Sequence, residues 1–187
     1  MKQANLRPDP DRLGLVIIDM QDRLAAAMPQ DAMQKVIRNT SIWIEAAKEF
    51  HFPIILTEQY PRGLGATVNE IRTMVDDIQP VEKMGFSCLR EPGFVRALEE
   101  SKARRLILCG METHVCVYQT ALDLLEGGMD VFLPADAVCS RTKFNWKTGL
   151  NMIHNAGGVV GSTEAFLFQL LKEAGTERFK KFSKLLR

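Results

Sequence analysis

The chain has 187 residues, of which 46% are hydrophobic and 25% are charged, and its formal net charge at pH 7 is +1. This length and composition are typical of one globular domain that can bury its own core. The near-zero charge gives no electrostatic reason to expect binding to nucleic acid or to an anionic membrane.

Short apolar runs alternate along the chain with segments whose apolar residues recur at helical spacing. The runs predict strands over residues 13–18, 53–57, 81–86, 104–109, 129–134 and 159–160. The helical spacing predicts helices over residues 31–50, 69–78, 92–101, 117–126, 143–155, 163–174 and 177–186, with a Pro- and Gly-containing loop over residues 59–68. The alternation predicts an α/β fold: a three-layer α/β/α Rossmann-like sandwich with a mainly parallel sheet of about six strands.

The chain contains no internal repeat and no low-complexity segment. We therefore expect a single domain over residues 1–187, with a core over residues 10–172 and a C-terminal helical extension over residues 173–187. In the extension, basic and apolar residues alternate in the way typical of a helix with one solvent-exposed face.

Four cysteines, Cys88, Cys109, Cys116 and Cys139, occur without a C-x-x-C pair or a zinc-ligand spacing. Free thiols are typical of a reducing compartment. The first residues lack the apolar region of a signal peptide, and no apolar run is long enough to span a bilayer. We therefore expect a cytoplasmic protein that does not associate with membranes.

Cys116 lies where the strand predicted at 104–109 leads into the helix predicted at 117–126. The unpaired N–H groups and the dipole at a helix start favour a thiolate over a thiol. A thiolate in that position is a nucleophile for an electrophilic carbon. On position alone, a buried cysteine that fills a gap between helix and sheet is an equally good interpretation.

Two more polar residues follow predicted strands, and parallel sheets of this kind bind ligands at the carboxyl ends of their strands. Asp19 directly follows the run 13–18, where a carboxylate is costly unless it is paired or functional; a helix N-cap fits as well. Lys83 lies in the third strand region, where a surface lysine is the ordinary interpretation. Together Asp19, Lys83 and Cys116 would supply a base, a cation and a nucleophile for acyl transfer through a thioester.

Several segments match the pattern of a known family: Leu15-Val16-Ile17-Ile18-Asp19-Met20-Gln21, Lys83 followed by Phe86-Ser87, Gly110-x-x-Thr113-x-x-Cys116-Val117, and Asp136-Ala137-Val138-Cys139-Ser140-Arg141. With them the chain resembles the isochorismatase-like cysteine hydrolases over nearly its whole length. The segment Thr57-Glu58-Gln59-Tyr60-Pro61-Arg62-Gly63-Leu64-Gly65 resembles a narrower branch, the isochorismatase domain-containing proteins.

The resemblance implies roles for individual residues. Cys116 attacks a carbonyl carbon, Asp19 shuttles protons, and Lys83 supports the developing charge. A cis peptide bond is implied between Met111 and Glu112, which aims the backbone N–H groups of Glu112 and Cys116 at an oxyanion. The resemblance also implies a homo-oligomer that acts on a small-molecule substrate.

The chain departs from some members of that family. Members that cleave nicotinamide bind a metal through Asp and His ligands in the loop after the second strand, but residues 58–69 contain no histidine. We therefore expect no metal and no cofactor, and nicotinamidase activity is in doubt. Members that cleave isochorismate lack the cysteine. Cys116 therefore favours a metal-independent hydrolase that cleaves the C–N bond of an amide, ureido or carbamoyl group.

Four residues near the predicted site are candidates for substrate contact: Gln59, Tyr60, Phe86 and His114. Gln59 can both donate to and accept from an amide, although a polar turn explains it equally well. Phe86 suits either an apolar wall or the core, and His114 suits either substrate contact or an ordinary loop position. For the whole protein, a catalytically silent scaffold is the main alternative, and a thiol redox protein is a third.

Overall fold

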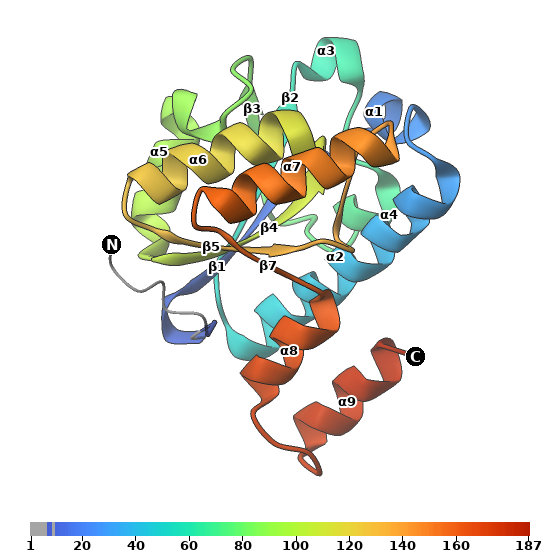
Figure 1. The fold of residues 1–187 in the computed structure, drawn as a ribbon, viewed down its shortest axis with the longest axis vertical. Coiled ribbons are helices and arrows are strands. Elements are labelled where there is room, and N and C mark those ends of the chain that lie inside the picture. Colours follow the sequence, from blue (N-terminus) through green and yellow to red (C-terminus); the bar gives the residue numbers. More distant parts are fainter. Residues whose placement is uncertain (1–6, 9) are drawn as a thin grey trace.

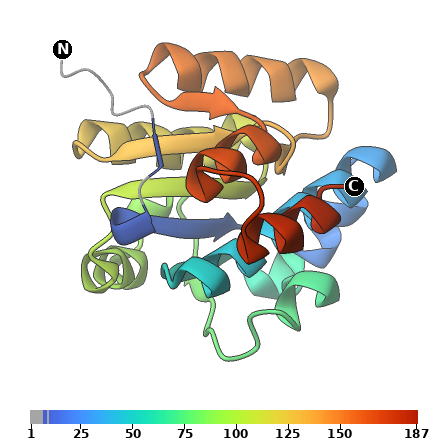
Figure 2. The ribbon, with the colours of Figure 1, turned by 90° about the horizontal axis from the view of Figure 1, so that it is seen from below.

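The computed structural model describes residues 7–8 and 10–187. Its centre is a seven-stranded sheet in the order β3-β2-β1-β4-β5-β7, with β6 paired to β4 off this path. All pairings between these strands are parallel. Helices cover both faces of the sheet (Figure 1, Figure 2). The predicted α/β/α sandwich with a mainly parallel sheet is confirmed.

The strands are β1 (Leu13–Ile18), β2 (Ile54–Gln59), β3 (Val81–Lys83), β4 (Arg105–Met111), β5 (Asp130–Pro134), β6 (Val138–Cys139) and β7 (Val159–Gly161). Six of them correspond to predicted apolar runs. The strand that the prediction lacks is β6, which lies in the short connection between β5 and α7.

The two faces of the sheet carry different helices. One face packs against α2 (Gln30–Phe50), α4 (Asn69–Arg72) and α8 (Thr163–Leu171), and the other against α5 (Pro92–Ser101), α6 (Tyr118–Glu126) and α7 (Lys143–Asn155). The last helix, α9 (Glu177–Leu185), packs on α2. The connections contain α1 (Asp22–Ala26), α3 (Pro61–Leu64), η1 (Pro10–Arg12), η2 (Cys88–Arg90) and η3 (Thr113–Val117), of which η3 is a single π-helical turn.

In two of the elements that end earlier than the sequence predicts, a side chain bonds the backbone that follows. The helix predicted over 69–78 ends at Arg72, whose guanidinium donates to the carbonyls of Val75 (2.6 Å) and Ile78 (2.8 Å). The strand predicted over 81–86 ends at Lys83, whose ammonium donates to two carbonyls just beyond it. In both places the chain curls around a cation instead of continuing the regular element.

β1 lies at the centre of the sheet, and all six of its residues are buried. A parallel strand covered on both faces has a continuous apolar run for this reason. At its carboxyl end, Ile18 pairs with Thr57 of β2 and with Gly110 of β4. The residue that follows β1 therefore emerges between the ends of two neighbouring strands.

Gly110 permits the close approach of β4 to β1 at this end of the sheet. Its φ is 116°, and a Cβ atom there would lie 2.0 Å from the carbonyl oxygen of Ile18. No other residue type fits that conformation and that space without displacing the backbone. The edge of the sheet at which Asp19 emerges is therefore tightly constrained.

The C-terminal helix α9 packs onto α2 and extends the core. Phe182 is fully buried, and its ring stacks on Phe50 with the ring centroids 6.3 Å apart. Around it, Arg178 and Lys181 of α9 pair with Glu49 of α2. The segment 173–187 is thus held by an apolar anchor with ion pairs at its rim.

The described residues include no helix with both the length and the apolar character needed to cross a membrane. The 21-residue helix α2 is long enough in number of residues, but charged side chains recur along it.

We predict that Phe182→Ala lowers the free energy of unfolding by about 3–5 kcal/mol, because it removes a fully buried aromatic ring from the contact between α9 and α2. Urea denaturation of the full chain measures this loss. Phe168→Ala, at a ring that is 39% exposed, is the control and should cost clearly less. Equal costs for the two variants would show that α9 does not belong to the cooperative core.

Candidate active site

Three polar residues singled out in the sequence lie together at the carboxyl edge of the sheet. Asp19 directly follows β1, Lys83 is the last residue of β3, and Cys116 lies in η3, after β4. All three are buried. The Asp19 carboxylate contacts both the Lys83 ammonium and the Cys116 thiol. The fold thus brings a carboxylate, an ammonium and a thiol into one cluster.

Both the backbone and the side chain of Asp19 are held by β2. Its φ of 51° lies in the left-handed region, which costs a non-glycine residue about 1–3 kcal/mol. Its N–H donates to the carbonyl of Thr57 (3.2 Å), and the Thr57 hydroxyl donates to Asp19 Oδ1 (2.7 Å). Helix α1 begins only at Asp22, with Gln21 at its N-cap position. The interpretation of Asp19 as a helix cap is therefore wrong.

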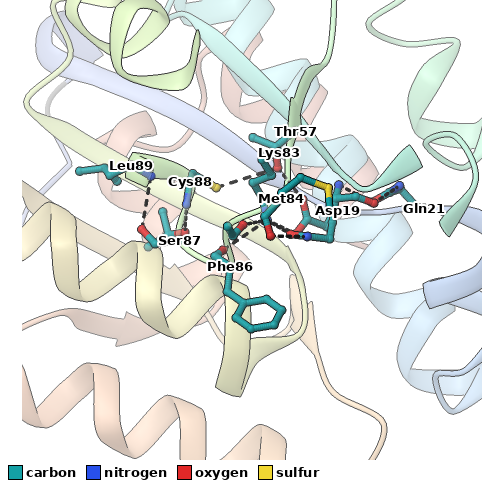
Figure 3. Close-up of polar contacts among 12 residues, drawn as sticks. Asp19, Gln21, Thr57, Lys83, Met84, Phe86, Ser87, Cys88 and Leu89 are labelled. Carbon is teal, nitrogen blue, oxygen red and sulfur yellow. Dashed lines mark hydrogen bonds and ion pairs between the residues drawn. The ribbon is translucent and has the colours of Figure 1, made fainter. Parts of the chain in front are cut away.

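Lys83 is buried, so its interpretation as a surface lysine is also wrong. Its Nζ lies 2.7 Å from Asp19 Oδ2 and 2.7 Å from Gln59 Oε1, and 3.2 Å from each of the carbonyl oxygens of Gly85 and Phe86 (Figure 3). Three N–H groups thus meet four protein acceptors. Burial alone would lower the pKa of Lys83, but the charge and hydrogen bond of Asp19 together with the neighbouring Cys88 and Cys116 outweigh it, and the pKa is raised.

The pKa of the Cys116 thiol is raised well above its ordinary value, first by burial and next by the negative charge of Asp19. The positive charge of Lys83 opposes this shift without cancelling it. The expectation that the helix start favours a thiolate did not allow for burial and Asp19, which both favour the protonated thiol. At neutral pH the resting thiol is protonated, and the base in contact with it is the Asp19 carboxylate.

The loop that leads from β4 to Cys116 is braced by the segment around β6. The bond between Met111 and Glu112 is cis. The Glu112 carboxylate accepts from the backbone N–H (3.0 Å) and from Nε (3.2 Å) of Arg141. His114 Nδ1 lies 3.1 Å from the Ser140 hydroxyl, so its imidazole is directed toward the brace. The segment 136–141 thus fixes the loop from outside the cluster.

Gln59 and Phe86 lie beside Lys83, but they use different groups to reach it. The Gln59 amide accepts from Lys83 through Oε1 and donates to the Met84 carbonyl through Nε2 (2.9 Å), so the protein engages both of its ends. Phe86 contacts Lys83 only through its carbonyl, and its ring is 53% exposed, which excludes the interpretation as a core residue.

A cavity of about 370 Å³ opens beside Lys83, between the loops that follow β2 and β3. This volume is within the range of small-molecule sites. Tyr60 and Met84 lie in its wall and are largely exposed. The cavity is lined by Tyr60, Pro61, Arg62, Glu82, Lys83, Met84 and Glu91.

Residues that the sequence analysis did not single out complete the cluster. Thr57 holds Asp19, and the Gln21 amide bonds both the N–H (2.7 Å) and the carbonyl (3.0 Å) of Gln59. The buried Cys88 thiol lies 4.0 Å from the Thr57 hydroxyl. The sequence did contain a signal for Thr57 and Gln21. Thr57 is a polar residue within a buried strand, β2, and Gln21 is a polar residue just after another, β1. Each of these strands lies next to a strand that leads to a candidate catalytic residue.

Within residues 7–8 and 10–187, no group of three or more His, Cys, Asp or Glu side chains is arranged to hold a metal ion. Side-chain oxygen atoms near the loop after β2, which are the atoms a metal ion would need as ligands, already accept hydrogen bonds from the protein. Glu58 Oε1 accepts from both the N–H and the hydroxyl of Thr67 (2.7 Å each), and Gln59 Oε1 accepts from Lys83. These side chains do not fit a metal site without breaking those bonds.

The family model described as "Isochorismatase domain" matches residues 14–165. A secreted isochorismatase effector, Isc1, of Phytophthora sojae is 39% identical over 178 residues, covering 92% of this chain and 83% of that protein. The isochorismatase domain-containing protein 2 of Danio rerio is 36% identical over 172 residues, covering 92% of this chain and 85% of that protein. The resemblance to this family and to its narrower branch is confirmed.

Two solved structures share the fold over most of the chain. One, described as the MAR1 ribonuclease of Caenorhabditis elegans, has a TM-score of 0.86 and 32% identity and covers 96% of this chain and 92% of its own. The other, the YcaC gene product of Escherichia coli, is described as an octameric hydrolase of unknown specificity. It has a TM-score of 0.87 and 23% identity and covers 96% of this chain and 90% of its own.

We predict that Lys83→Met lowers the free energy of unfolding by about 3–5 kcal/mol, because it leaves the Asp19 carboxylate buried and unpaired. The double variant Asp19→Asn with Lys83→Met should recover part of that loss, since it removes both charges. Urea denaturation of the wild type, both single variants and the double variant gives the four free energies of unfolding that a double-mutant cycle requires. If the double variant is no more stable than Lys83→Met, the pair is not the source of the loss.

Proposed function

This chain belongs to the isochorismatase family, and we propose that it is a metal-independent cysteine hydrolase that cleaves a C–N bond of a small amide, ureido or carbamoyl substrate. The observation that carries the proposal is the contact of one buried carboxylate, Asp19, with both the Lys83 ammonium and the Cys116 thiol. A thiol, a base and a fixed cation are the groups that acyl transfer through a thioester requires.

In the proposed first half of the reaction, the Cys116 thiol transfers its proton to Asp19, and the sulfur forms a bond to the substrate carbonyl carbon. The carbonyl oxygen becomes an oxyanion, for which the backbone N–H groups of Glu112 and Cys116 are the proposed donors. The C–N bond then breaks, and the leaving amine takes the proton from Asp19. The product of this half is a thioester on Cys116.

In the second half, Asp19 removes a proton from water, and the oxygen of that water attacks the thioester carbonyl. The C–S bond breaks, the sulfur takes back the proton, and the acid product leaves. Asp19 thus acts as base and acid in turn, which suits a carboxylate whose orientation is fixed by β2. Each cycle consumes one water and returns Cys116 to its protonated resting state.

Lys83 acts through its charge in this scheme. Its N–H groups are already taken by protein acceptors, so it has no free donor for the substrate oxyanion. A fixed positive charge stabilises the negative charge of the cluster whether that charge lies on Asp19 or on the Cys116 sulfur. The proton can therefore move between those two groups without changing the net charge beside Lys83.

The cavity beside Lys83 is the proposed entrance for substrate. Tyr60 and the exposed Phe86 supply aromatic surface near it, and Arg62 supplies a cation in its wall. We propose Tyr60 and Phe86 as substrate contacts. Gln59 and His114 instead bond Lys83 and Ser140, so we propose that they position the site.

Homo-oligomerisation and a cytoplasmic location belong to the proposal. The E. coli neighbour is described as octameric, which supports an oligomer of this chain. The four free cysteines support a reducing compartment, whereas the secreted P. sojae relative does not. We expect multi-angle light scattering at micromolar concentration to give a mass above that of one chain; a monomer would contradict the proposal.

We predict that a panel of small amides, ureido and carbamoyl compounds contains at least one that the wild type hydrolyses with release of ammonia or amine. Cys116→Ala should lower that rate by about 10³-fold or more, because the nucleophile is lost. Asp19→Asn should also abolish turnover. Cys109→Ala is the matched control: it removes a buried thiol from the core cluster on the other face of the sheet and should retain the wild-type rate.

The same panel tests the competing functions. No hydrolysis together with a Cys116 that iodoacetamide does not label would favour the catalytically silent scaffold. A short single-stranded RNA belongs in the panel because the C. elegans neighbour is described as a ribonuclease. Turnover of any compound that is unchanged in Cys116→Ala would contradict the thioester mechanism.

A further inference from the structure

Thr57 contacts the proposed base through both its backbone and its side chain. It lies in β2 opposite Ile18, its carbonyl accepts from the Asp19 N–H, and its hydroxyl donates to Asp19 Oδ1 at 2.7 Å. Thr57 is fully buried. A fully buried side chain has no route to a substrate, so any effect of Thr57 on the reaction acts through Asp19.

The Thr57 hydroxyl also lies beside a second thiol. Cys88 Sγ lies 4.0 Å from Thr57 Oγ1, and the N–H of Cys88 is held by Thr120 Oγ1 at 3.0 Å (Figure 3). Burial raises the pKa of the Cys88 thiol to about 12, so this thiol keeps its proton at neutral pH. Because Cys88 donates to Thr57 Oγ1, the single proton of Thr57 is left for Asp19.

The charged and titratable groups that face the Asp19 carboxylate come from three elements. Lys83 of β3 pairs with Oδ2, and Cys116 of η3 and Cys88 of η2 are the neighbouring thiols. On β2, the Thr57 hydroxyl is the group bonded to Oδ1. A donor to a carboxylate favours its ionised form and restricts its rotation. A base that must accept the proton of Cys116 needs both properties.

We propose that Thr57 is a positioning residue that holds Asp19 oriented toward the Cys116 thiol. This inference rests on the proposed function, in which Asp19 is the base. It gives a role to the buried series of side-chain contacts Cys88–Thr57–Asp19, of which the proposed reaction steps use only Asp19.

Thr57→Val removes the hydroxyl with little change of volume, and Thr57→Ser keeps it. The probe is iodoacetamide, and the readout is the labelling rate of the Cys116 peptide by mass spectrometry from pH 4.5 to 9. In Thr57→Val, the labelling rate at neutral pH should fall by about tenfold, because the carboxylate that accepts the Cys116 proton has lost the hydrogen bond that orients it. Thr57→Ser should restore the wild-type profile. Thr40→Val, at an equally buried threonine of α2, should leave the profile unchanged.

Asp19→Asn separates the failure of this inference from failure of the proposed function. If Asp19→Asn lowers the labelling rate while Thr57→Val leaves it unchanged, Thr57 does not position the base, although the base assignment stands. If Asp19→Asn keeps the wild-type labelling rate, the base assignment itself fails. An equal loss of rate in Thr57→Val and Thr57→Ser also overturns the inference, because the hydroxyl is then not the group that matters.

Discussion

Asp19 and Lys83 are both removed from water, and buried charges are tolerated only when each is paired and its remaining hydrogen-bonding groups are satisfied. Residues at the carboxyl edge of the sheet supply most of the partners that the two charges need. Asp19 directly follows β1 with its backbone in the left-handed region, and its Oδ2 meets the ammonium. β2 continues to Gln59, whose amide oxygen accepts a second N–H. After Lys83 the chain curls back, so that two of its own carbonyls complete the shell.

The same burial that makes the pair costly also sets the chemistry of Cys116. In its buried position next to a carboxylate, the thiol has a raised pKa, which favours its protonated form. A protonated thiol beside an ionised base is nevertheless suitable for the proposed reaction, since the proton has a short path and the net charge near Lys83 does not change. The nucleophile is then formed only when a substrate carbon is present to receive it.

Much of the sheet was predictable because parallel strands buried on both faces have continuous apolar runs, as β1 and β4 do. Asp19, Lys83 and Cys116 could be selected because each follows or ends such a run and matches the family pattern. The contacts that complete the cluster were not predictable, because they join residues far apart in the chain: Lys83 bonds Gln59, 24 residues away, and Thr57 bonds Asp19, 38 residues away. The ends of α4 and β3 were missed for a related reason, since both are set by a cation that binds carbonyls beyond the regular element.

The central claim is that Cys116 forms a covalent bond to the carbonyl carbon of the substrate, with Asp19 as its base. Its most direct test is acid-quenched mass spectrometry of the protein during turnover of a hydrolysed amide from the panel. The account predicts that the Cys116 peptide gains the mass of the acyl group and loses it again once the substrate is exhausted. Turnover without an adduct in the wild type and in slowly deacylating variants, or an adduct on a residue other than Cys116, would contradict it.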